Sequence, residues 1–162
     1  MSIKNISSLK AYKLLEIDNN NMIIDVRTAE EWQQVGIPKL DKDKIIFISW
    51  RLLPNMSLNN EFKNQLMSKI SNIVNSGEFG ARSDGATPIS NRRATSDDVP
   101  NFSSIDYNYK LLFLCRSGGR SHEAAQFAST LGYKECYNII DGFEGGTNGA
   151  GWKQNNLPWQ IL

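Results

Sequence analysis

The sequence predicts a single α/β domain in which a central parallel β-sheet is flanked by helices on both faces. Two observations lead to this prediction. Short, almost wholly apolar runs alternate along the chain with longer segments whose apolar residues recur every three or four positions. Turn and helix-capping residues separate these segments, and such apolar runs are typical of strands that are buried on both faces. The length of 162 residues fits one domain.

The expected elements follow from these patterns in chain order. Strands are expected at residues 22–26, 45–48, 111–114 and 137–140, and helices at about residues 8–17, 28–35, 58–74 and 121–131. A capping box formed by Thr28 and Glu31 predicts that the second helix begins directly after Arg27. Ser57 is the expected cap of the third helix, and Gly132 is the expected stop of the fourth.

Charge and cysteine content exclude several classes of protein. The formal net charge of +1 gives no electrostatic argument for a nucleic-acid or membrane partner. Cys115 and Cys136 form no C-x-x-C pair, and together with the single His122 they are too few for a structural zinc site. The polar N-terminus and the strand-sized apolar runs predict neither a signal peptide nor a membrane span. We therefore expect a cytoplasmic protein with both thiols reduced, no metal and no cofactor.

The composition changes between Asn75 and Ser104. This segment is rich in Gly, Ser, Asp and Thr, and no lysine occurs between Lys69 and Lys110. A loop of roughly thirty residues without structure of its own is uncommon in a compact domain, where it is usually a functional lid or a disordered insert. The composition favours a disordered insert at about 75–104. We expect it to interrupt one working domain that spans residues 1–162.

The residues that carry chemistry lie between the third expected strand and the fourth expected helix. They are Cys115, Arg116, Ser117, Gly118, Gly119, Arg120 and Ser121. A nucleophilic cysteine acts as its thiolate, which positive potential favours. Arg116, Arg120 and the amino end of the following helix all supply positive potential at this point. We therefore expect an exposed, reactive Cys115.

Glycines and hydroxyls complete this loop. Gly118 and Gly119 allow the backbone to curl so that successive N–H groups point toward one centre, which suits an anion or a charged sulfur. Ser117 and Ser121 add hydroxyl donors. The loop is therefore interpreted as an anion cradle with a nucleophile at its base. The structural alternative is a Gly-Ser turn with two solvated arginines and a buried cysteine.

With these motifs the chain resembles a rhodanese-type sulfurtransferase domain. The loop after the strand matches the family's active loop, and Asp25-Val26-Arg27 with Glu31-Trp32 resembles its early D-V-R…E-[YFW] block. The family's glycine-rich turn after the last expected strand appears as Asp141–Gly146, and Leu157-Pro158-Trp159 resembles the family's usual ending. The resemblance covers almost the whole chain outside residues 75–104 and implies a rhodanese-like central parallel sheet. One departure is Val35–Leu40, where the family's usual G-H-I-P-G-A stretch lacks its histidine.

The resemblance implies a two-step sulfur transfer. Cys115 would take a sulfane sulfur from an anionic donor such as thiosulfate, and a thiophilic acceptor would then remove it from the Cys115 persulfide. A thiol, a cyanide-like molecule or a protein are open as acceptors. Arg116 and Arg120, with the loop residues between them and Ser121, are expected to bind the donor. Asp25 and Arg27 are expected to anchor the loop.

Two other functions remain open at this point. Tyrosine phosphatases and arsenate reductases also place a cysteine and an arginine around an anion, but with five residues between them. Here only four residues separate Cys115 from Arg120. The smaller ring suits one sulfur atom better than a tetrahedral phosphoryl or arsenate group. The second alternative is a non-enzymatic binding module on the rhodanese fold, although the complete loop disfavours it.

Overall fold

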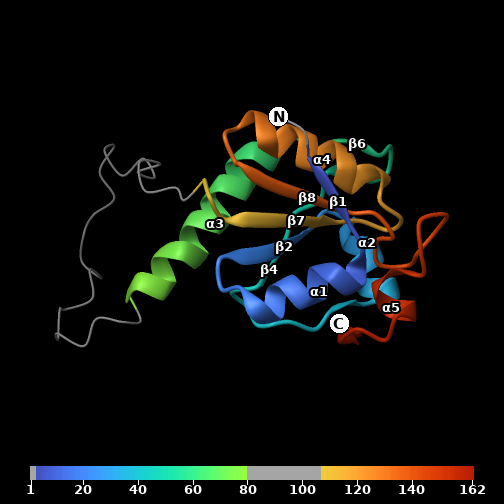
Figure 1. Cartoon of the computed structure of the whole chain (residues 1–162). Helices are drawn as coiled ribbons and strands as arrows, with labels where there is room; N and C mark the ends of the chain where they lie inside the picture. The colour runs from blue at the N-terminus through green and yellow to red at the C-terminus, as the bar shows by residue number, and fades with distance from the viewer. Residues whose placement is uncertain (1–2, 80–106) are drawn as a thin grey trace.

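The computed structural model describes residues 3–79 and 107–162, and it confirms an α/β fold (Figure 1). Five parallel strands form the main sheet in the order β1-β8-β7-β2-β4. The elements are β1 (Lys4–Ile6), α1 (Ser8–Ile17), β2 (Asn21–Asp25), α2 (Ala29–Val35), β3 (Ile37–Pro38), β4 (Ile45–Phe47), β5 (Arg51–Leu52), β6 (Ser57–Leu58), α3 (Phe62–Phe79), β7 (Lys110–Leu114), α4 (Gly119–Thr130), β8 (Glu135–Ile139), α5 (Gly151–Gln154) and β9 (Trp159–Gln160).

The strand register brings polar residues together at one edge of the sheet. Asp25, the last residue of β2, lies opposite Leu114, the last residue of β7. On the other side of β7, Phe113 lies opposite Asn138 of β8. The carboxyl ends of these strands meet on the right-hand side of Figure 1, and ligands of open α/β sheets bind at such an edge. The fold therefore places Cys115, which follows β7 directly, where a site is expected.

Two apolar cores lie on the two faces of the sheet. Helices α3 and α4 cover one face, and α1, α2 and α5 cover the other (Figure 1). The first core contains Met22, Ile24, Val26, Ile46, Ile48, Phe62, Leu66, Ile70, Leu111, Phe113, Cys115, Ala124, Ala125, Ala128, Tyr133 and Cys136. The second contains Ile6, Ala11, Leu15, Ile23, Ile45, Leu112, Leu114, Ile139, Phe143, Trp152 and Leu157. Alternate residues of β2 and β7 enter opposite cores, as strands covered on both faces require.

The four expected strands are confirmed with small shifts in their ends, and so are the expected start of α2 and the expected stop of α4. The capping box of Thr28 and Glu31 is present at the start of α2. Gly132 has φ +108° directly after the C-cap of α4 and so ends that helix. Helix α4 begins at Gly119, two residues before the expected start at Ser121. The edge strand β1 was not predicted, because Lys4 and Asn5 make it look like a polar terminus.

The third expected helix is wrong at its start. Ser57 and Leu58 form strand β6, which pairs with β5, so Ser57 does not cap a helix. The Asn59 carboxamide oxygen accepts a hydrogen bond from the Glu61 N–H at 3.0 Å, and this turn precedes α3. The apolar residues recur every three or four positions from Leu58 onward, but the turn at Asn59 keeps Leu58 out of the helix.

Helix α3 continues to Phe79, beyond Asn75, where the expected insert begins. The remainder of that insert lies outside the described residues. Figure 1 shows that α3 ends on the side of the sheet opposite the carboxyl ends of the strands. In the described part of the chain, no helix is long and apolar enough to cross a bilayer.

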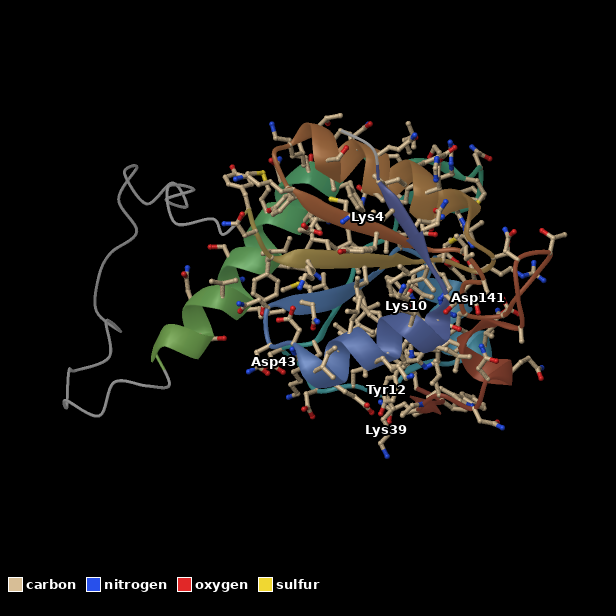
Figure 2. The ribbon with its side chains drawn as sticks, in the orientation of Figure 1. Lys4, Lys10, Tyr12, Lys39, Asp43 and Asp141 are labelled. Carbon is tan, nitrogen blue, oxygen red and sulfur yellow. The ribbon has the colours of Figure 1, made fainter. Side chains whose placement is uncertain are left out.

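Asp141 fastens the start of α1 to the glycine-rich turn after β8 (Figure 2). Its carboxylate is buried and accepts hydrogen bonds from the Ser8 N–H at 2.8 Å and the Ser8 hydroxyl at 2.6 Å. It also accepts the Gly151 N–H at 3.1 Å, which joins α5 to the same point. A carboxylate at a helix N-terminus satisfies N–H groups that lack partners within the helix.

We expect Asp141→Asn to lower the free energy of unfolding by about 2 kcal/mol, because an amide replaces a charged acceptor of three donors. Urea unfolding followed by circular dichroism measures the change. Asp43→Asn is the control, since Asp43 is exposed and lies far from Asp141 in Figure 2. Equal unfolding free energies for the two variants would show that Asp141 does not hold these elements together.

Candidate active site

The Cys115 thiol lies at the base of the loop that joins β7 to α4. The Gly118 N–H donates to its Sγ at 3.1 Å, and the Ser121 Oγ lies 3.2 Å from the same sulfur. Cys115 is only 1% exposed, so the expectation of an exposed thiol is wrong. The reason is that the side chain turns inward to the core beneath α3 and α4, while Gly118 and Ser121 close over the sulfur. Any molecule that reacts with Sγ would therefore have to pass the loop.

A polar network continues from the sulfur into β8. The Asn138 side-chain nitrogen donates to the Gly118 carbonyl at 3.2 Å. The side-chain oxygen of Asn138 then faces the Ser121 hydroxyl, 2.6 Å away. Because that oxygen can only accept, the Ser121 hydroxyl donates to Asn138 and presents a lone pair to Cys115. In this arrangement the Cys115 S–H donates to Ser121. Asn138 was not predicted from the sequence, where the one sign of its role is that it is a polar residue within an apolar strand.

The two glycines of the loop have different roles. Gly118 has φ +104°, and a Cβ at this position would lie 2.5 Å from the Ile140 carbonyl oxygen. A Cβ on Gly119 would meet no described atom within 4 Å, and Gly119 is already the first residue of α4. Only Gly118 therefore needs to be glycine for the loop to form.

The loop is fixed to the glycine-rich turn through its backbone. The Phe143 N–H donates to the Cys115 carbonyl at 2.8 Å, and the Glu144 N–H donates to the Arg116 carbonyl at 3.0 Å. Gly142 allows this approach, since a Cβ there would lie 2.3 Å from the Arg116 oxygen. The position of the sulfur therefore depends on a segment that begins 26 residues after Cys115 in the chain.

Both loop arginines are paired with carboxylates. Arg120 binds Glu31 through two hydrogen bonds, at 2.7 and 3.0 Å. Burial disfavours the charged guanidinium, but the bonds and charge of Glu31 outweigh it and raise the pKa of Arg120. Burial likewise disfavours the Glu31 carboxylate, but the bonds and charge of Arg120 outweigh it and lower the pKa of Glu31. Arg116 is 66% exposed and has its Nε 3.1 Å from Glu144.

Asp25 and Arg27 form an ion pair at the end of β2. The Arg27 Nη2 lies 2.7 Å from Asp25, and both side chains are fully buried. The guanidinium also donates to the Gly36 carbonyl at 2.9 Å and stacks 4.1 Å from the ring centre of Phe143. Phe143 also donates its N–H to the Cys115 carbonyl, so a chain of contacts joins this ion pair to the loop.

A cavity of about 670 Å³ opens beside the loop. Six of the residues that line it are Ser117, Gly118, Gly119, His122, Glu123 and Asn138. His122 therefore faces a hollow next to the loop, whereas Trp50 packs between Phe62 and Phe127. The Trp50 indole N–H donates to Glu123 at 2.8 Å.

Cys136 is remote from this site. Burial, with a smaller contribution from the charge of Glu135, raises its pKa to about 12. It lies opposite Leu111, which precedes Cys115 by four residues, or about 13 Å of strand. Its thiol packs in the core and donates weakly to the Tyr133 carbonyl. Neither its position nor its protonation suits a resolving cysteine.

Comparison with known proteins decides the family. Residues 8–148 match the family described as "Rhodanese-like domain". The chain belongs to this family. A relative in Rickettsia conorii, "Uncharacterized protein RC0915", is 43% identical over 162 residues, which cover 99% of this chain and 100% of the relative. "Uncharacterized protein RP600" of Rickettsia prowazekii is 42% identical with the same coverage.

Solved structures show the same rhodanese-like fold. Rv0390 from M. tuberculosis superimposes with a TM-score of 0.69 at 25% identity, covering 100% of both chains. The polysulfide-sulfur transferase homodimer from Wolinella succinogenes has a TM-score of 0.59 at 18% identity. It covers 99% of this chain and 80% of that chain. At that identity the second likeness concerns the fold alone.

We expect Gly118→Ala to destabilise this rhodanese-like domain by about 2 kcal/mol or more, because its Cβ meets the Ile140 carbonyl at a positive φ. Gly119→Ala is the matched control and should change stability by less than about 0.5 kcal/mol. Chemical unfolding of both variants measures the difference. Similar losses in the two variants would contradict the distinction between the glycines.

Proposed function

We propose that this chain is a sulfurtransferase that carries a sulfane sulfur on Cys115. The observation that carries the proposal is the Cys115 sulfur at the amino end of α4, with the Gly118 N–H directed at it from 3.1 Å. A backbone donor and a helix amino end both favour negative charge on that sulfur. Membership in the rhodanese-like family supports the same reaction class.

In the first step the Cys115 thiolate attacks the outer sulfur of an anionic donor, for which thiosulfate is the reference case. A bond forms between Sγ and this sulfur, the donor's S–S bond breaks, and sulfite leaves with the bonding electron pair. The thiol proton goes to solvent before the attack. The Gly118 N–H and the amino end of α4 then stabilise the persulfide anion.

In the second step a thiophilic acceptor attacks the outer sulfur of the persulfide. A bond forms between the acceptor and this sulfur, and the Cys115 thiolate leaves. Thiols, cyanide and a protein thiol all suit this chemistry. The cavity beside Ser117 and His122 is the proposed approach for the acceptor.

The remaining loop residues hold the donor and the sulfur in place. Arg116 is mostly exposed and contacts Glu144 through its Nε, which leaves its Nη groups for an anion, whereas Arg120 is held by Glu31. Ser121 contacts the sulfur, and Ser117 and Gly119 are exposed on the surface of the loop. Asp25 and Arg27 act as anchoring residues through Phe143.

The test is the mass of the protein after incubation with a sulfur donor. We expect the protein to gain the mass of one sulfur atom on Cys115 and to transfer it to cyanide as thiocyanate. Cys115→Ser should abolish both the added mass and the turnover. Cys136→Ser should keep both, because the Cys136 thiol is buried and stays protonated.

A protein that gains no sulfur from any sulfane donor, while remaining folded, would contradict the proposal and favour the binding-module alternative. Added sulfur on Cys136 in place of Cys115 would contradict the assignment of the nucleophile. The phosphatase and arsenate-reductase alternative has no support from the family match. Hydrolysis of a simple phosphate ester would reopen it.

A further inference from the structure

Asn138 is a buried polar residue that β8 places beside the cysteine loop. Only 4% of its surface is exposed. A buried amide is costly unless its nitrogen and its oxygen both find partners. The nitrogen of Asn138 contacts the Gly118 carbonyl and, at 3.4 Å, the side-chain oxygen of Asn5. Its oxygen contacts the Ser121 hydroxyl, so the amide lies one residue away from the Cys115 sulfur.

The Gly118 carbonyl fixes which way this amide points. A carbonyl can only accept, so the nitrogen of Asn138 faces it, and the oxygen of Asn138 faces Ser121. The reversed amide would bring two acceptors together at the Gly118 carbonyl. That carbonyl also accepts the His122 N–H at 3.3 Å, which holds it in the first turn of α4. The loop backbone therefore determines the orientation of Asn138.

The orientation of Asn138 decides where the Ser121 proton lies. A serine hydroxyl has one proton, and the short contact of 2.6 Å assigns that proton to the Asn138 oxygen. Ser121 then presents only lone pairs to the Cys115 sulfur, 3.2 Å away. This contact stabilises a thiol, whose S–H finds an acceptor, and disfavours a thiolate. It opposes the Gly118 N–H, which donates to the same sulfur.

We propose that Asn138 is a positioning residue that favours the protonated thiol of Cys115 by holding the Ser121 proton away from the sulfur. This inference rests on the proposed function only in that Cys115 is the nucleophile there. On ionisation the thiol proton goes to solvent and the negative charge stays on Sγ. A thiolate that receives fewer hydrogen bonds is less stabilised and attacks a sulfur donor more readily.

Other charged and titratable groups surround the loop, and the charge of Arg120 interacts directly with that of Cys115. The substitutions below leave all of these groups unchanged. Among the described residues they are Asp25 and Arg27 at the end of β2, Glu31 of α2, the exposed Lys63 and Lys69 of α3, Arg116 of the loop, Arg120, His122 and Glu123 of α4, and Asp141 and Glu144 of the turn after β8.

The experiment is a pH titration of the Cys115 thiolate by its ultraviolet absorbance, in Cys136→Ser protein so that one thiol titrates. Asn138→Leu keeps the size of the side chain but removes the acceptor, which frees Ser121 to donate to the thiolate. We expect the pH of half-ionisation to fall by about one unit. In a Ser121→Ala background the same substitution should change it by less than about 0.3 unit.

Asn5→Ala is the matched control. It removes a neighbouring amide that contacts the nitrogen of Asn138 and leaves the oxygen facing Ser121 in place. This variant should titrate like the parent protein. No shift in Asn138→Leu would overturn the proposal. An equal shift with and without Ser121 would also overturn it, because Asn138 would then act only by shaping the loop.

The infrared S–H stretch tests the same arrangement without a change at Asn138, should Asn138→Leu fail to fold. In Cys136→Ser protein this band should lie at a lower frequency than in the Ser121→Ala variant, because the S–H donates to Ser121. Equal frequencies would overturn the proposal. A protein that titrates as expected but gains no sulfur from any donor would contradict the proposed function and support the role of Asn138.

Discussion

The backbone contact between the cysteine loop and the glycine-rich turn after β8 is the constraint on which the rest of the site depends. Two hydrogen bonds, from Phe143 and Glu144 to the carbonyls of Cys115 and Arg116, join segments that a whole helix and strand separate. The close approach leaves no room for a Cβ at Gly142. The glycine-rich turn therefore determines where the loop begins and which way the Cys115 sulfur points.

The buried pair of Asp25 and Arg27 has a positional role beneath that contact. Removing two charges from water is costly, so such a pair is weak evidence for stability in itself. Here both side chains are fully buried, and Arg27 also bonds the Gly36 carbonyl and stacks on Phe143. Loss of one partner would leave an uncompensated buried charge, a change that costs about 3–5 kcal/mol in other proteins. The Arg27 guanidinium thus contacts the ring of Phe143, whose N–H bonds the Cys115 carbonyl of the loop.

The sequence predicted the parts of the molecule whose signals are local. The buried strands are continuous apolar runs, and the box of Thr28 and Glu31 marks the start of α2 within four residues. It did not predict β1, since an edge strand with Lys4 and Asn5 has no apolar run. It also placed the start of α3 too early, because the turn at Asn59 depends on one hydrogen bond from the Glu61 N–H to the Asn59 side chain.

The sequence indicates the contiguous loop of the candidate site, but it does not indicate which distant side chains pair with that loop. The loop from Cys115 to Ser121 is contiguous and could be recognised directly. Glu31 lies 89 residues before its partner Arg120, so no local pattern links them. Asn138 reaches the sulfur only through Ser121, again from another strand. Long-range pairs of this kind depend on strand order and register, which the apolar pattern leaves open.

The same network explains why the resting thiol and the reactive thiolate need different hydrogen bonds. Ser121 has one proton, which it donates to Asn138 while the Cys115 S–H donates to Ser121. A thiolate has no proton to give, so Ser121 must either turn its hydroxyl to the sulfur or leave a lone pair facing a negative charge. Turning it removes a donor from the buried Asn138 oxygen. The Gly118 N–H and the amino end of α4 offset that loss, because they favour negative charge on the sulfur whichever way Ser121 points.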